Sequence, residues 1–102
     1  MTAVLEVISP QQINLSGQLN FYTITPLCAQ AKACAPATGP VTVSLQGVTE
    51  ADSAALLVIL TLLRAVEKQK QTILFTHLPA SILALIQLYD LEKVIPYQTN
   101  NS

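Results

Sequence analysis

A strand pattern, a helix pattern and a second strand pattern follow one another between residues 41 and 76, and this order limits the folds open to the chain. Residues 41–45 alternate apolar and polar side chains, which is the two-residue period of a strand with one buried face. Residues 52–69 have a helical period, a capping residue at the start and cations near the end. Residues 72–76 form a short, largely apolar strand. This succession predicts a βαβ unit with parallel strands and a right-handed crossover.

The rest of the chain is predicted to add further strands and helices to this unit. The expected elements are strands at 3–8 and 12–16, a helix at 25–34, a loop at 35–40, a helix that follows Pro79 and ends near Tyr89, and a short strand at Val94–Ile95. Ser9-Pro10-Gln11 suits the turn of a hairpin, and Thr25-Pro26 suits a helix start. We therefore expect an α/β fold, with a small mixed, mainly parallel sheet of four to five strands covered by about three helices.

The length and composition of the chain indicate one folded domain. Its 102 residues are enough for one hydrophobic core and too few for two. Hydrophobic residues make up 51% and charged residues 11%, so the chain should fold with less charged surface than is usual. We expect a single domain at 1–96 and a frayed polar tail at 97–102. The scarcity of charge suggests that part of the surface meets a partner.

Charge and motifs argue against several classes of function. The net charge is −1, and the five basic residues form no stripe that would neutralise the phosphates of a nucleic acid. The chain starts with no secretory signal, and its longest nearly apolar run, 54–63, is about half of a membrane span, so we expect a cytoplasmic protein. Cys28 and Cys34 are expected to be reduced thiols, because their spacing fits neither a redox pair nor a zinc site. No metal and no cofactor are expected.

The helix at 52–69 has more apolar surface than one buried face requires. On a helical wheel, one side carries Ala55, Leu56, Ile59, Leu62, Leu63 and Val66, and this side should pack on the sheet. The opposite side carries Ser53, Ala54, Leu57, Thr61, Arg64 and Lys68, with Leu60 at its margin. Two explanations stay open: the first helix covers Leu57 and Leu60, or the first turns of this side bind a partner protein.

Two short sequence motifs occur at the ends of two of the predicted strands. The first is Leu15-Ser16-Gly17-Gln18-Leu19, a strand that ends in a small turn with glycine. The second is the segment 41–48, which contains the predicted strand and leads to Asp52-Ser53-Ala54-Ala55-Leu56, in which an acidic residue, a serine and two small residues begin a helix. Together they resemble the STAS family, named for sulfate transporters and anti-sigma factor antagonists. The chain is most similar to the small STAS subunits of bacterial Mla-type phospholipid ABC transporters, which also have a close counterpart of Leu88-Tyr89-Asp90-Leu91.

This resemblance implies a protein that acts by docking. It implies a non-enzymatic cytoplasmic subunit that binds the transporter's ATPase subunit, supports its assembly or activity, and so maintains outer-membrane lipid asymmetry. Such a subunit meets the inner membrane only through its partner, and whether the free chain dimerises stays open. The predicted partner-binding residues are Thr49, Asp52, Ser53, Ala54, Leu57 and Thr61.

An anti-sigma factor antagonist is the alternative function within the same family. In that case an anti-sigma factor kinase would be the partner and would phosphorylate Ser53, at a helix start where free N–H groups and the dipole favour phosphate. Helix capping alone would also explain Asp52 and Ser53. Two departures weaken the switch hypothesis: Ser44 replaces a common aspartate, and Ala54-Ala55 replaces a pair with glycine. An enzyme is not expected, because the only histidine, His77, has no partner at a recurring spacing.

Overall fold

The computed structural model describes residues 3–33 and 40–98, which form a four-stranded sheet and three helices. The strands are β1 (Ala3–Ser9), β2 (Gln12–Leu19), β3 (Val41–Ala51) and β4 (Ile73–Thr76), and they lie in the sheet in this order. β1 pairs with β2 in antiparallel fashion, whereas β2, β3 and β4 are parallel. The predicted mixed, mainly parallel sheet with an N-terminal hairpin is therefore confirmed.

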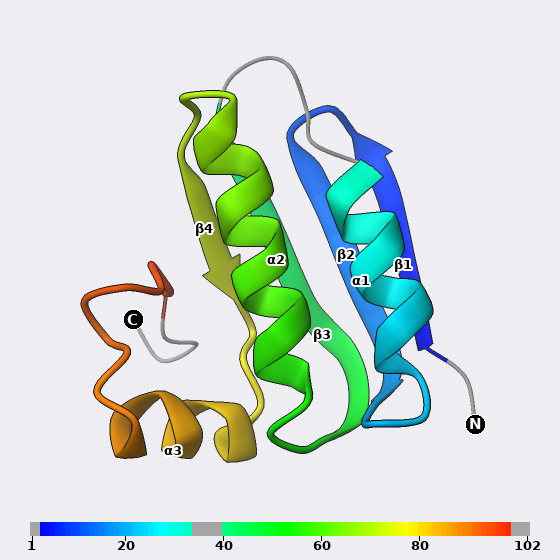
Figure 1. Ribbon diagram of the computed structural model, residues 1–102, viewed down its shortest axis with the longest axis vertical. Coiled ribbons are helices and arrows are strands. Elements are labelled where there is room, and N and C mark those ends of the chain that lie inside the picture. The colour runs from blue at the N-terminus through cyan, green and yellow to red at the C-terminus, as the bar shows by residue number, and fades with distance from the viewer. Residues whose placement is uncertain (1–2, 34–39, 99–102) are drawn as a thin grey trace.

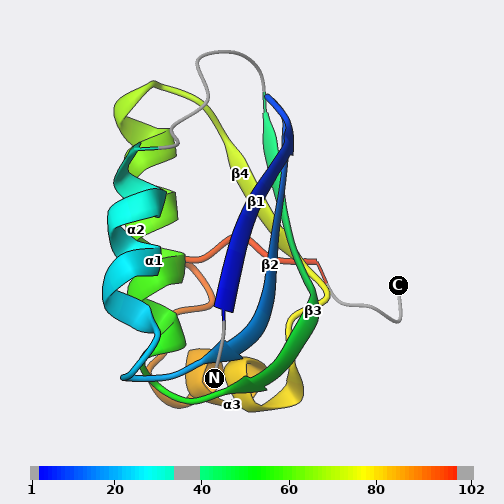
Figure 2. The ribbon, with the colours of Figure 1, turned by 90° about the vertical axis from the view of Figure 1, so that its right-hand side faces the viewer.

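Two helices cover one face of the sheet and a third lies across its end. Helices α1 (Ile24–Ala33) and α2 (Ala55–Lys68) pack side by side on the same face (Figure 2). Two successive crossovers of the same hand that step in the same direction place their helices on one face. Helix α3 (Ala80–Leu88) lies beyond the carboxyl ends of the parallel strands (Figure 1). Cys34, which was expected to be a reduced thiol, and most of the predicted loop at 35–40 lie outside the described residues.

The hydrophobic core lies between this face of the sheet and the two helices. Alternate residues of the central strands point into it: Ile13, Leu15 and Leu19 of β2, and Val41, Val43 and Leu45 of β3. The predicted inner side of α2 is buried as a whole, and Val58 joins it. Thr42, Ser44 and their neighbours on β2 occupy the opposite face, which no described helix covers (Figure 2). The two-residue period has therefore separated a core face from a polar face.

Both central strands continue beyond their predicted ends at residues 16 and 45. Gly17 adopts a left-handed φ of 89°, so it produces an irregularity within β2 where a turn was expected. A second register shift pairs Ser16 with Gly47, and a Cβ added to Gly47 would lie 2.8 Å from the Cβ of Ser16. Glycine at both shifts allows the strands to bend and stay paired, so they continue to Leu19 and Ala51.

The C-terminal segment adds to the edge of the sheet at a different place from the one predicted. No strand forms at Val94–Ile95; instead Tyr97 makes a parallel bridge with Phe75. The Phe75 N–H donates to the Pro96 carbonyl at 3.0 Å, and the Gln98 N–H donates to the Phe75 carbonyl at 2.8 Å. The hydrogen-bonded chain therefore extends two residues past the predicted domain end at 96, while 99–102 lie outside the described residues.

Among the described residues, none of the helices combines the length and the apolar character that a membrane span requires.

Candidate docking surface

The carboxyl ends of β2 and β3 bring two loops together at one end of the sheet. Leu19 pairs with Ala51, and the Asp52 N–H donates to the Leu19 carbonyl at 3.1 Å. The loop that enters α1 and the loop that enters α2 therefore lie side by side at the lower end of the molecule (Figure 1). This end of a parallel sheet is where loops commonly build binding sites.

The start of α2 is organised by Asp52. One carboxylate oxygen of Asp52 accepts a hydrogen bond from the Ala54 N–H at 2.8 Å, and its carbonyl accepts one from the Ala55 N–H at 3.0 Å. Ser53 is exposed, and its hydroxyl makes no hydrogen bond to any residue that the structure describes. The N-cap position of α2 is Ala54, which has no side-chain capping bond; of Asp52 and Ser53, Asp52 supplies a side-chain hydrogen bond within the turn before the helix and Ser53 does not.

Four of the six predicted partner-binding residues form one exposed group, and two do not belong to it. Thr49, Asp52 and Ser53 are exposed, and Leu57 keeps 51% of its surface open. Ala54 does not contribute to this exposed group: only 1% of its surface is exposed, because the turn before α2 directs its side chain into the core. Thr61 is half-buried between the helices, where its hydroxyl donates to the Leu57 carbonyl at 2.6 Å.

The two leucines of the apolar surplus on α2, Leu60 and Leu57, differ in how far they are covered. Leu60 is half-buried and packs against the core, and the packing of α1 beside α2 reduces the open surface on this side of the helix. The hydroxyl of Thr61 also lies 3.9 Å from Cys28 Sγ of α1. The first turn of α2 is not covered in the same way, so Leu57 remains half-exposed. A half-exposed leucine beside exposed polar residues is a suitable surface for a partner.

Two aromatic residues that the sequence analysis did not select lie in the neighbouring loop. Phe21 and Tyr22 are 68% and 83% exposed. Asn20 Oδ1 accepts hydrogen bonds from the Tyr22 and Thr23 N–H groups at 2.9 and 3.2 Å. The Thr23 hydroxyl donates to the Gln18 carbonyl at 2.7 Å. The loop is thus fixed by hydrogen bonds while its aromatic side chains face outward. The sequence did contain a signal for these two residues: they are adjacent aromatic residues between a predicted strand and a predicted helix, in a chain with only five aromatic residues.

We call the combined group the docking surface. It consists of Phe21, Tyr22, Thr49, Asp52, Ser53 and Leu57. It presents aromatic and aliphatic side chains around one carboxylate and small hydroxyl groups. Aromatic anchors on a rigid frame are typical of the residues that dominate protein–protein binding energy.

The residues needed for serine-hydrolase chemistry are not assembled at this surface. His77 has a φ of 56°, and its Nδ1 lies 3.2 Å from Thr76 Oγ1 and 3.5 Å from Ser44 Oγ. This places the imidazole beside Ser44 and Thr76, and no bond links it to Ser53. Ser44 Oγ also accepts a hydrogen bond from the Gln46 N–H at 3.3 Å. No group of three potential metal ligands occurs among the described residues.

Two solved structures share this fold at low sequence identity. A proposed anti-sigma factor antagonist from Thermotoga maritima superposes with a TM-score of 0.72 at 14% identity, covering 97% of this chain and 88% of that one. The anti-sigma factor antagonist SpoIIAA in its unphosphorylated form superposes with a TM-score of 0.67 at 12% identity, covering 94% of this chain and 86% of that one. These similarities establish the fold alone.

Sequence comparison identifies the family more narrowly. No curated protein matches the chain. A family model described as the MlaB STAS domain matches residues 5–96, which is most of the chain. The chain therefore belongs to the MlaB-type STAS-domain family.

Proposed function

We propose that this chain is a non-enzymatic STAS subunit that docks onto the cytoplasmic ATPase subunit of an Mla-type phospholipid ABC transporter. In this role it supports the assembly or activity of the transporter and, through it, outer-membrane lipid asymmetry. The chain would be cytoplasmic and would meet the inner membrane only through this partner. Membership of the MlaB-type family supports the choice of partner.

The observation that supports docking most directly is the docking surface itself. Leu57, Phe21 and Tyr22 expose apolar side chains at one end of the sheet, whereas many other large apolar side chains of the chain are fully buried in the core. Leaving three large apolar groups in water has a cost that a partner removes when it covers them. The hydrogen bonds around Asn20 and the turn at Asp52 fix both loops before binding. Preorganised loops lose little conformational entropy on association.

A role without catalysis is supported by the chemistry at this surface. Ser53 has no imidazole bonded to its hydroxyl, and His77 is instead within reach of Ser44. No described carboxylate is bonded to His77, so the ring has no partner of the kind that orients a catalytic base. The chain has no glycine-rich phosphate-binding motif of the P-loop type.

The proposal is tested by copurifying the chain with an Mla-type ATPase subunit. The wild-type chain should copurify, and Leu57→Glu should abolish the complex, because a carboxylate would be buried without a partner. Ile8→Glu is the matched control, since Ile8 is 54% exposed at the opposite end of the sheet. Circular dichroism should show both variants folded. A folded Leu57→Glu variant that still copurifies would exclude the docking surface, and a wild-type chain that does not copurify would contradict the proposed partner.

The alternative function is an anti-sigma factor antagonist switched by phosphorylation of Ser53. The fold shared with SpoIIAA and the exposed, unbonded hydroxyl of Ser53 favour it. The backbone of the turn argues against it. The Ala54 N–H already donates to Asp52, and the N–H groups of Ala55 and Leu56 donate to backbone carbonyls. A phosphate on Ser53 would therefore find few free donors and would lie next to the Asp52 carboxylate.

The two functions predict different states of Ser53. Intact mass spectrometry of protein from native cells should find no phosphate on the chain if it is a transporter subunit. Stoichiometric phosphate on Ser53 would favour the switch. The Ser53→Asp variant separates the two further, because it should block docking on an ATPase while Ser53→Ala should leave docking nearly unchanged.

A further inference from the structure

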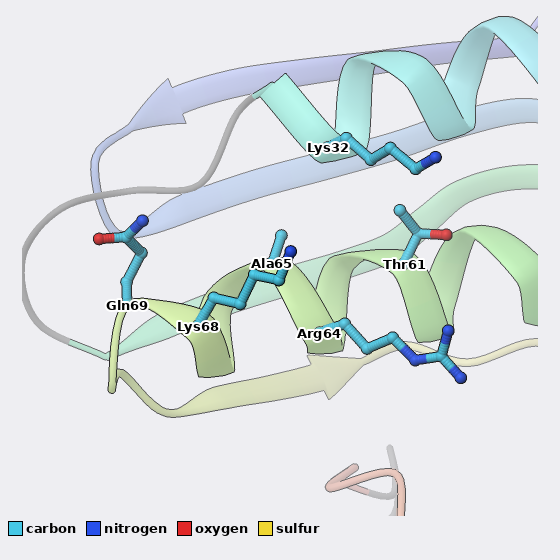
Figure 3. A pocket seen from close by; sticks show the side chains of 6 residues that line it. All are labelled: Lys32, Thr61, Arg64, Ala65, Lys68 and Gln69. Carbon is cyan, nitrogen blue, oxygen red and sulfur yellow. The ribbon is translucent and has the colours of Figure 1, made fainter.

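A basic groove lies between α1 and α2, at the other end of α2 from the docking surface. The groove has a volume of about 380 Å³ and is lined by Lys32, Thr61, Arg64, Ala65, Lys68 and Gln69 (Figure 3). Leu57 and Lys68 are eleven residues apart on α2, which corresponds to about 16 Å along the axis. The groove and the docking surface are therefore distinct regions of the molecule.

Positive charge is concentrated around this groove. Three of the chain's five basic residues line it, in a protein whose net charge is −1. Lys32 reaches toward the groove from α1, and Lys68 extends along α2 toward it, with Arg64 on the outer side of the same helix (Figure 3). No acidic residue lines the groove, and no ion pair forms within residues 3–33 and 40–98. The three charges are therefore not neutralised by carboxylates.

The helix dipoles account for only part of this arrangement. Lys32 and Lys68 lie in the last turns of α1 and α2, where a cation is favourable. Each helix end carries the equivalent of about half a negative charge, so two ends offset about one of the three positive charges. The dipoles therefore leave part of this positive charge uncompensated, and Arg64 lies before the last turn of α2.

We propose that this groove binds a phosphate-bearing anion. Ammonium and guanidinium groups donate charge-assisted hydrogen bonds to phosphate oxygens, and the Gln69 amide adds further donors. The volume lies within the range of small-molecule sites. No aromatic side chain lines the groove, so a nucleotide base would have no stacking surface, and recognition rests on the phosphate itself. The phosphate belongs either to a free small molecule or to the headgroup of an anionic lipid.

The proposal is tested with two phosphate probes and two single-charge variants. Pyrophosphate is titrated into the protein by calorimetry at low ionic strength, and vesicles of phosphatidylglycerol or phosphatidylcholine are tested by cosedimentation. Lys68→Gln should weaken binding of the active probe by at least about fivefold, because it removes a charge-assisted contact. Lys93→Gln is the matched control, since Lys93 is exposed and does not line the groove. Both variants replace exposed residues and should remain folded.

The outcomes separate the two sources of phosphate. Binding of pyrophosphate that is weakened by Lys68→Gln and not by Lys93→Gln supports a free phosphate compound. Binding to phosphatidylglycerol vesicles alone, with the same dependence on Lys68, supports a lipid headgroup. Failure of both probes at millimolar concentration, or equal losses in the two variants, would overturn the proposal. Copurification with the ATPase subunit should be unaffected by Lys68→Gln, so failure here is distinguishable from failure of the docking surface.

Discussion

Replacing Asp52 with alanine tests how the docking surface is organised. The carboxylate of Asp52 accepts a hydrogen bond of 2.8 Å from the Ala54 N–H at the start of α2. Asp52→Ala removes this acceptor, while the side chain of Ala54 stays buried. The neighbouring Ser53→Ala removes a hydroxyl that bonds to no described residue. The two substitutions at adjacent positions should therefore have very different consequences for stability.

The cost of Asp52→Ala follows from two contributions. Loss of a side-chain hydrogen bond to the backbone typically lowers the free energy of unfolding by about 1 kcal/mol. Loss of a negative charge at an exposed helix N-terminus adds about 0.3 to 1 kcal/mol. The total of about 1.5 kcal/mol corresponds to a fall in Tm of roughly 6 to 12 °C for a domain of this size. Ser53→Ala should change the free energy of unfolding by less than about 0.5 kcal/mol.

Urea unfolding followed by circular dichroism measures these differences. Glu50→Ala is the control for charge, because Glu50 is an exposed carboxylate two residues earlier with no side-chain hydrogen bond to the described residues. Glu50→Ala should leave the free energy of unfolding nearly unchanged. Equal destabilisation by Asp52→Ala and Glu50→Ala would show that general charge matters and that the 2.8 Å bond does not. A larger loss of stability in Ser53→Ala than in Asp52→Ala would show that Ser53, and not Asp52, stabilises this turn.

Three further substitutions probe the packing of the core and the hydrogen bonds of the aromatic loop. Gly47→Ala should lower the free energy of unfolding by about 1 to 3 kcal/mol in urea, because the new Cβ would lie 2.8 Å from that of Ser16; an unchanged midpoint would contradict the close approach. Ile95→Ala should cost about 2 to 5 kcal/mol, since Ile95 is fully buried; a neutral result would mean that the C-terminal segment does not pack on the core. Thr23→Val should speed amide exchange in the aromatic loop and weaken binding of the ATPase subunit, because the 2.7 Å bond to the Gln18 carbonyl is lost; unchanged exchange would refute this role.

The sequence predicted most elements of the fold because the relevant signals are local. The two-residue period of 41–45 and the helical period of α2 depend on backbone geometry within a few residues. The inner side of α2 followed from that period and is buried as predicted. The α/β class, the mixed sheet and the hairpin followed from the order of these patterns.

The lengths of the central strands depended on contacts that the sequence pattern does not contain. Gly17 looked like the end of a strand, because glycine usually marks a turn. In the folded chain its φ of 89° lies within β2, where pairing with β3 continues beyond the irregularity. Gly47 is needed because Ser16, 31 residues earlier, approaches it closely. Only the pairing of the strands determines whether a glycine ends a strand or bends it.

The two candidate sites were accessible to sequence reasoning to different degrees. Ser53 and Leu57 could be selected because they share one side of the predicted helix at 52–69, which begins at Asp52. The burial of Ala54 and the position of the loop after Leu19 beside the loop that enters α2 required the packing of β2 against β3, which joins segments some 30 residues apart. The basic groove also depends on tertiary structure. Along the sequence the basic residues form no stripe. The packing of α1 on α2 places Lys32 in the same groove as Arg64 and Lys68, because residues distant along a chain share a surface only when the fold brings their helices side by side.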